Sequence, residues 1–267
     1  MWFKIKDMLN YEIEGNGTET LVLLHGFMEN LSIWEDLKPY LSEKFKLIKI
    51  DLPGFGKSEV IAEVQTMDLM ADELKKVTDH LKLTAFHLLG HSMGGYIALA
   101  FAEKYPEDLK SFTLFFSTYF ADDEEKKQTR TKGLRIIKEN LRAFVNAGVP
   151  NLFNPNEHDI LESKIKLAKE IAYTSSVDGV LASQKGMIER PDRSKVLENF
   201  EGKILILSGK HDSAVNSEKT IKNLPDNTNI KSYVLDCGHN GHWEKPEVCA
   251  SIINTELLHH LPKNLVL

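Results

Sequence analysis

The fold of this chain is decided by the stretch Leu88-Leu89-Gly90-His91-Ser92-Met93-Gly94-Gly95. An apolar run, residues 85–89, leads directly into its glycine and serine, and a segment rich in small residues follows until Pro106 ends it. This order predicts a buried strand, a sharp turn that carries one serine, and a helix. Because Gly-x-Ser-x-Gly also occurs in ordinary strand–turn–helix segments, the motif alone leaves a catalytic role open.

Three further segments place polar residues directly after apolar strands. They are residues 20–24 followed by His25-Gly26-Phe27, residues 204–207 followed by Ser208-Gly209-Lys210-His211-Asp212, and residues 232–236 followed by Cys237-Gly238-His239. The carboxyl ends of parallel strands meet at one edge of a sheet, where ligands and catalytic groups gather. We therefore expect these segments to lie beside the turn that carries Ser92.

The order of Ser92, Asp212 and His239 along the chain predicts a catalytic triad. His239 would take the proton of Ser92 during attack on a carbonyl, and Asp212 would orient the imidazole. The backbone N–H groups of Phe27 and Met93 are expected to form an oxyanion hole for the attacked carbonyl.

The combined motifs resemble the α/β-hydrolase superfamily. The resemblance rests on His25-Gly26-Phe27, the loop Asp51 to Ser58, Gly90-His91-Ser92-Met93-Gly94-Gly95, Gly209-x-x-Asp212, and Gly-His-x4-Glu-x-Pro-Glu from Gly238 to Glu247. It covers nearly the whole chain and is weakest between about residues 119 and 195. Within the superfamily the chain is similar to the small carboxylesterase branch, which includes enol-lactonases, cofactor-free perhydrolases and pimeloyl-carrier-protein methyl ester esterases.

The resemblance implies an α/β-hydrolase fold, with a mostly parallel eight-stranded sheet flanked by helices and a helical cap inserted after the sixth strand. Residues 3–13 are expected to form a leading pair of strands, and residues 31–41 a helix. Strands and helices stop alternating at residues 118–195, where the pattern is helical and charged. We therefore expect a core of residues 1–117 and 196–267, and a cap of residues 118–195 that covers Ser92.

Alternatives exist for the base and for the acid. The family places its base directly after the glycine, which favours His239 over His242. Some relatives carry the acid after the preceding strand, so Asp122 is a rival of Asp212, which is favoured. Cys237 is expected to be a small buried residue rather than a nucleophile.

Four neighbours are expected to support the site. His25 and His91 flank the two key loops and would orient them by hydrogen bonds. Gly26 belongs to the expected oxyanion loop, and Gly94 allows the strand and the helix to approach closely.

These residues predict a serine hydrolase that cleaves a small-molecule carboxylic ester, thioester or lactone through an acyl-enzyme, without a cofactor. A lyase, a carbon–carbon hydrolase or a perhydrolase would use the same triad, because the pocket sets the chemistry. A non-catalytic ligand receptor on this fold is a further alternative, although such proteins usually have a damaged triad.

Other chemistries are disfavoured by the motifs. The segment Gly54 to Ser58 contains the Gly-Lys-Ser of a phosphate loop, but Asp51 stands where that motif needs glycine. The segment His239 to His242 lacks the His-Glu-x-x-His pattern, so no metal is expected.

Composition favours a cytoplasmic enzyme. A length of 267 residues suits one α/β domain with an insertion. The net charge of −6 argues against general nucleic-acid binding. We expect no membrane span, since no apolar run approaches about 18 residues. We also expect no signal peptide and, with two cysteines, no disulfide framework.

One strip of positive charge lies within the expected cap. Residues 126–142 carry seven lysines or arginines and one glutamate, a net charge of +6 (7 − 1). They are Lys126, Lys127, Arg130, Lys132, Arg135, Lys138 and Arg142 against Glu139. The strip is either a solvated helix face or a surface that steers an acidic partner, such as an acyl carrier protein, to the pocket.

Overall fold

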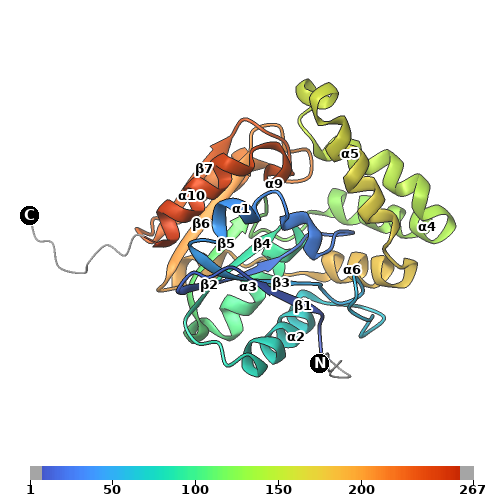
Figure 1. Ribbon diagram of the computed structural model, residues 1–267. Helices are drawn as coiled ribbons and strands as arrows, with labels where there is room; N and C mark the ends of the chain where they lie inside the picture. Colours follow the sequence, from blue (N-terminus) through green and yellow to red (C-terminus); the bar gives the residue numbers. More distant parts are fainter. Residues whose placement is uncertain (1–7, 259–267) are drawn as a thin grey trace, which may run out of the picture.

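The computed structural model describes residues 8–258, and a mostly parallel sheet lies at its centre (Figure 1). The strands follow the order β1-β3-β2-β4-β5-β6-β7, and only β1 is antiparallel to its neighbour. They are β1 (Tyr11–Glu14), β2 (Glu19–Leu24), β3 (Phe45–Ile50), β4 (Phe86–His91), β5 (Leu109–Phe115), β6 (Lys203–Gly209) and β7 (Ile230–Leu235). Parallel strands need apolar residues on both faces, and β4 is buried along its whole length.

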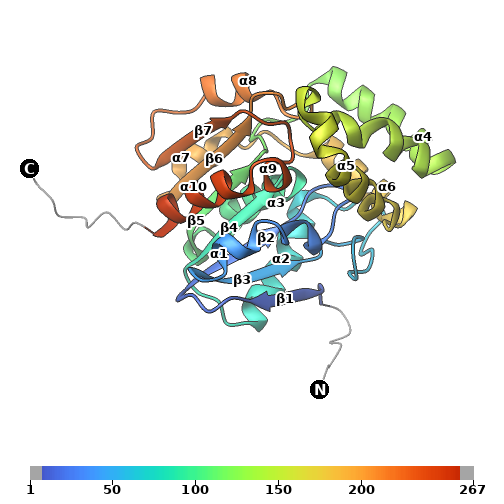
Figure 2. The same ribbon diagram turned by 45° about the horizontal axis from the view of Figure 1, so that its top comes forward.

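Helices cover both faces of this sheet (Figure 2). One face carries α2 (Met67–His80), α3 (Met93–Lys104) and α7 (Ser194–Asn199). The other carries α1 (Lys38–Leu41), α9 (Gly241–Glu244) and α10 (Pro246–Leu258). A seventh helix, α8 (Ser217–Lys222), connects β6 to β7. Within residues 8–258 no helix is long and apolar enough to cross a membrane.

Three further helices lie between β5 and α7 and gather at one end of the molecule (Figures 1 and 2). They are α4 (Glu124–Gly148), α5 (His158–Tyr173) and α6 (Val177–Glu189), and α4 packs against both of the others. Short 3-10 turns, η3 (Val149–Leu152) and η4 (Pro155–Glu157), join α4 to α5. The helical character expected for residues 118–195 is present, while their status as a separate cap domain stays a prediction.

The described sheet has seven strands where eight were expected. The extra leading strand was expected within residues 3–13, and residues 1–7 lie outside the described part of the chain. The insertion accordingly follows β5. The helix expected at residues 31–41 is split into η1 (Leu31–Trp34) and α1. Pro39 lies in the first turn of α1, where its missing N–H favours the start of a new helix.

Residues 177–189 form α6, a helix that the sequence pattern does not predict. Two glycines lower the helix propensity of this segment. A Cβ at Gly186 would lie 1.8 Å from the carbonyl oxygen of Gln65, and one at Gly179 would lie 2.2 Å from that of Gly54. These glycines are therefore explained by contact with residues 54–65, a requirement that only the tertiary structure reveals.

Candidate active site

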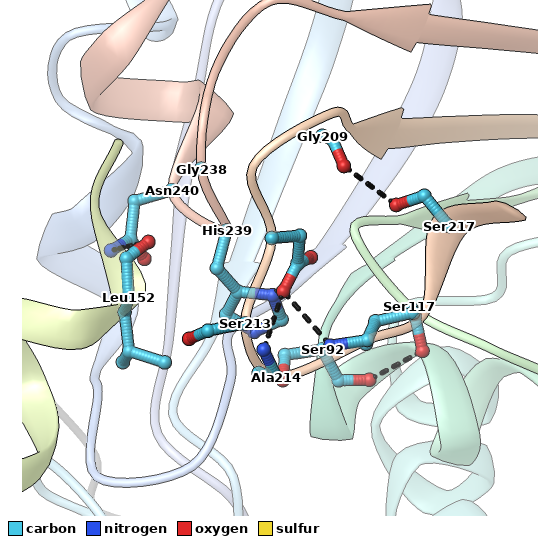
Figure 3. A network of polar contacts seen from close by, with 12 residues as sticks. Ser92, Ser117, Leu152, Gly209, Ser213, Ala214, Ser217, Gly238, His239 and Asn240 are labelled. Carbon is cyan, nitrogen blue, oxygen red and sulfur yellow. Dashed lines mark hydrogen bonds and ion pairs between the residues drawn. The ribbon is translucent and has the colours of Figure 1, made fainter. Parts of the chain in front are cut away.

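Ser92 lies in a strained turn between β4 and α3. Its φ of 50° and ψ of −113° place a non-glycine residue in a sparsely populated backbone region. Two contacts hold this conformation. The Ser92 N–H donates to the carbonyl oxygen of Phe115 over 3.0 Å, and the Ser117 hydroxyl donates to the Ser92 carbonyl over 2.7 Å (Figure 3). The sharp turn expected from Gly-x-Ser-x-Gly is therefore present.

The glycines around Ser92 allow this turn to pack closely. A Cβ on Gly90 would lie 2.1 Å from the Gly94 carbonyl oxygen. A Cβ on Gly94 would lie 2.5 Å from the Leu24 carbonyl oxygen, at the end of β2. Larger residues at either position would push the strand and the helix apart, as the sequence predicts.

His239 and Asp212 come from the loops after β7 and β6 and meet directly. Nδ1 of His239 lies 2.7 Å from Oδ2 of Asp212, whose side chain is fully buried. The second carboxylate oxygen accepts the N–H groups of Ala214 and Val215 over 2.8 and 2.9 Å. Both oxygens of Asp212 are thus engaged, so the carboxylate is held in one orientation toward the imidazole.

The loop that carries His239 is fixed from several sides (Figure 3). The His239 N–H donates to the Leu152 carbonyl oxygen over 2.7 Å. Its carbonyl oxygen lies 3.0 Å from Nε2 of His91, the residue before Ser92. The His91 and His239 ring centroids are 4.9 Å apart. The predicted base therefore lies beside the turn that carries the predicted nucleophile.

Glu244 binds the same loop from α9. Its Oε2 accepts the N–H groups of Gly238 and Asn154 over 2.8 and 3.0 Å, and its Oε1 accepts the Asn240 N–H over 3.1 Å. Glu244 belongs to the motif from Gly238 to Glu247, but the motif predicts no role for it. Its position five residues after His239 was the only signal that the sequence offered.

The loop after β2 holds the expected oxyanion donors. Phe27 N–H donates to no other group among residues 8–258, and Met93 is the first residue of α3, where helix N–H groups lack intrahelical acceptors. Next to Phe27, the Gly26 N–H donates to Oε2 of Glu29 over 2.5 Å. Both amides are thus available to a bound oxyanion, and their role stays a prediction.

His25 and His91 both make hydrogen bonds beside the site, while their orienting role stays a prediction. His25 receives the Leu52 N–H at Nε2 over 2.9 Å and donates from Nδ1 to the Gly26 carbonyl over 2.7 Å. His91 contacts Glu29 through Nδ1 over 2.9 Å. The contact of Glu29 could not be predicted, because nothing in its local sequence pattern indicates a partner 62 residues away.

The rival residues occupy other environments. His242 is fully buried, and neither of its ring nitrogens has a hydrogen-bond partner among residues 8–258. Burial lowers its pKa well below the usual value. Asp122 is bound by Arg130 and Arg190 over 2.6 and 2.8 Å. Burial raises the pKa of the Cys237 thiol, which disfavours the thiolate that a nucleophile needs.

The loop that resembles a phosphate loop wraps around a carboxylate instead. Asp51 accepts the N–H groups of Lys57 and Leu31, each over 2.9 Å. Gly56 has a φ of +56°, and a Cβ there would lie 2.2 Å from Cγ of Asp51. The glycine is therefore explained by close packing on Asp51. Within residues 8–258, no group of three His, Cys, Asp or Glu side chains has a metal-binding arrangement.

Five of the seven cations in the expected basic strip already have partners. These contacts are Lys126 to the Ala214 carbonyl, Lys127 to Glu124, Arg130 to Asp122, Arg135 to Glu139, and Arg142 over the ring of Tyr173. Arg135 and Lys138 line a groove of about 720 Å³ between α4, α6 and residues 60–63. Steering of an acidic partner by this strip stays a prediction.

Comparisons with known proteins agree with the fold. The sequence pattern of the alpha/beta hydrolase fold matches residues 19–246. A thermophilic esterase from Thermogutta terrifontis, solved with malate bound, is 31% identical, with a TM-score of 0.88 over 94% of this chain and 93% of that one. An enol-lactonase from Burkholderia xenovorans shares the fold at 20% identity, with a TM-score of 0.86 over 94% and 96% of the chains. A 2-hydroxy-6-oxononadienedioate/2-hydroxy-6-oxononatrienedioate hydrolase from Paraburkholderia phymatum is 28% identical over 90% of this chain and 87% of the relative.

Proposed function

Because the chain belongs to the α/β-hydrolase family, we propose that it is a serine hydrolase that cleaves carboxylic esters with Ser92, His239 and Asp212. One observation carries the proposal. The imidazole of His239, hydrogen-bonded to Asp212 over 2.7 Å, lies beside His91 and thus beside the strained turn of Ser92. The 31% identity to a thermophilic esterase over nearly the whole chain favours ester chemistry.

The mechanism follows from these contacts. Since Nδ1 of His239 donates to Asp212, Nε2 is the nitrogen left to take the Ser92 proton. Ser92 Oγ then attacks the ester carbonyl carbon, and the Phe27 and Met93 N–H groups bind the oxyanion. The ester C–O bond breaks, and His239 returns the proton to the departing alcohol. Water repeats the sequence on the acyl-enzyme and releases the acid and free Ser92.

A panel of p-nitrophenyl esters of increasing acyl length tests this function, with Ser92→Ala as the control. We expect kcat/KM to depend on chain length and hydrolysis to vanish in the variant. A fluorophosphonate probe should label the wild-type protein at Ser92. Hydrolysis or labelling that survives in Ser92→Ala would refute the assignment of the nucleophile.

Carbon–carbon bond hydrolysis is the second candidate, because the Paraburkholderia relative is named as a hydrolase of an oxo-dienedioate. Such a compound contains no ester, so its hydrolysis must break a carbon–carbon bond beside a keto group. The same Ser92 and His239 would serve. The ratio of kcat/KM for a p-nitrophenyl ester to that for 2-hydroxy-6-oxononadienedioate distinguishes the candidates, and a ratio well below one would favour the second.

A further inference from the structure

Glu29 and His91 form a continuous connection between the two loops that the reaction needs. The Gly26 N–H donates to Oε2 of Glu29, and the same oxygen lies 2.9 Å from Nδ1 of His91. The other ring nitrogen, Nε2, lies 3.0 Å from the carbonyl oxygen of His239. The connection therefore runs from the loop after β2, through the end of β4, to the loop after β7.

The partners of His91 define its protonation. An ionised carboxylate and a carbonyl oxygen can only accept hydrogen bonds, so both ring nitrogens of His91 must donate. An imidazole with two N–H donors is an imidazolium. Burial alone would raise the pKa of Glu29, but the charge and hydrogen bond of His91 outweigh it and lower this pKa to about 2. Burial alone would likewise lower the pKa of His91, but Glu29 outweighs it and raises that pKa.

His25 provides a contrast within the same site. Its Nε2 accepts the Leu52 N–H, and its Nδ1 donates to the Gly26 carbonyl, an arrangement that requires a neutral ring. Burial lowers its pKa. The two buried histidines thus differ in charge: His25, after β2, is neutral, and His91, at the end of β4, is positive. Of the two, only His91 has a carboxylate as a direct partner.

Several ionisable groups surround His91. Glu29 lies in the loop before η1, and Asp212 lies in the loop after β6. His25 and His239 face it from the loops after β2 and β7, and His242 faces it from α9 with its ring centroid 4.7 Å away. Glu29 is the carboxylate that touches His91 directly, so its removal takes away most of the stabilisation of the imidazolium.

We propose that Glu29 is a positioning residue. It holds His91 as an imidazolium and thereby fixes the loop after β2, which carries Phe27, relative to the loop after β7, which carries His239. This inference rests on the proposed function, in which Phe27 N–H binds the oxyanion and His239 is the base. A neutral His91 has one N–H, so either the Glu29 contact or the His239 contact is lost. Small displacements at both loops would then slow the chemical step.

Glu29→Gln tests the role of the charge. The amide oxygen can accept the same two hydrogen bonds, whereas the negative charge is removed. We expect the alkaline limb of the kcat profile to move to lower pH, with kcat reduced about tenfold to about 10²-fold above neutrality and KM for a small ester nearly unchanged. Glu29→Asp, which retains the charge, should keep the limb near its wild-type position.

Glu35→Gln is the matched control. Glu35 directly follows η1 and pairs with Lys38 and Lys49 rather than with a histidine. Its substitution should lower stability through those ion pairs and leave the kcat profile unchanged. A Glu29→Gln profile that superimposes on the wild-type profile would overturn the proposal.

Histidine-selective ¹⁵N NMR reads the protonation without any substrate. Near neutral pH the wild-type protein should give two protonated ring nitrogens for His91 and one for His25, and Glu29→Gln should remove one proton from His91 only. A neutral His91 in the wild-type protein would also overturn the proposal. If the wild-type protein hydrolyses no ester, the proposed function fails, and the NMR result still decides the imidazolium by itself.

Discussion

The backbone N–H of His239 donates a 2.7 Å hydrogen bond to the carbonyl oxygen of Leu152. Leu152 belongs to η3, between α4 and α5, so the segment inserted after β5 holds the proposed base directly. The neighbouring Asn154 N–H donates to Glu244, which also binds Gly238 and Asn240. The insertion therefore contributes to the position of His239, in addition to the covering role that the sequence predicts for it.

Glu244→Ala should impair both stability and turnover. The substitution leaves three buried N–H groups without their charged acceptor, and hydrogen bonds to charged groups contribute about 1.5–3 kcal/mol each. Displacement of His239 should lower kcat by up to about 10²-fold. Thermal unfolding and ester kinetics would measure both effects. Glu247→Ala, which removes only an exposed contact with Tyr40, is the control and should change neither by much.

His239→Ala should reduce ester turnover as much as Ser92→Ala, by about 10⁵-fold to 10⁶-fold, because nucleophile and base act as one unit. The double variant should be no slower than either single variant. His242→Ala should cost under about tenfold in kcat, yet lower stability by about 2–4 kcal/mol, since its fully buried ring would leave a cavity. Steady-state kinetics and urea unfolding separate the two residues. A loss of activity in His242→Ala equal to that in His239→Ala would contradict the assignment of the base.

Asp212→Asn should mainly lower turnover, whereas Asp122→Asn should mainly lower stability. The first should lower kcat by about 10⁴-fold, because the amide favours the wrong imidazole tautomer. The second breaks the buried ion pairs with Arg130 and Arg190 and should destabilise the protein by about 3–5 kcal/mol. Its kcat at low temperature should stay close to the wild-type value. A large loss of kcat in folded Asp122→Asn would instead make Asp122 the acid.

The Glu29–His91 pair should give stability a defined pH dependence. The lowered pKa of Glu29 stabilises the fold above about pH 4.5 and ceases to do so as pH falls through about 2. The raised pKa of His91 stabilises the fold below pH 6.5 and ceases to do so as pH rises through the folded-state value. The difference in unfolding free energy between wild-type protein and Glu29→Gln should therefore be largest between about pH 4.5 and pH 6.5, where both contributions are present. A difference that is constant with pH, measured by urea unfolding, would show that ionisation contributes nothing.

The basic strip on α4 can be tested by charge reversal. Replacing Arg135 and Arg142 by Glu should raise the KM for an acyl-carrier substrate several-fold at low salt, and added salt should diminish the effect. Hydrolysis of a small neutral ester is the internal control and should hardly change. Equal effects on both substrates, or none, would remove the carrier-protein hypothesis.

The turn around Ser92 could be predicted from the sequence because its requirements are local. A strained φ followed at once by a helix demands small residues at positions 90 and 94, and those glycines are visible in the sequence. The alternation of apolar strands and helices likewise indicated a parallel sheet with its polar loops at one edge, and the comparisons confirm the α/β-hydrolase fold. Helix α6 was not predicted, because its glycines are required by contacts with residues distant in the sequence rather than by local backbone geometry.

Only the tertiary structure decided which side chains meet in the site. Asp122 and Asp212 both lie near strand ends, and the difference is that Arg130 and Arg190 occupy the first while His239 contacts the second. Glu29 reaches His91 across 62 residues of sequence. Such pairs depend on the order of strands in the sheet and on side-chain direction, neither of which leaves a local sequence pattern. The sequence therefore determined the residue types and their edge of the sheet, and packing determined their partners and charge states.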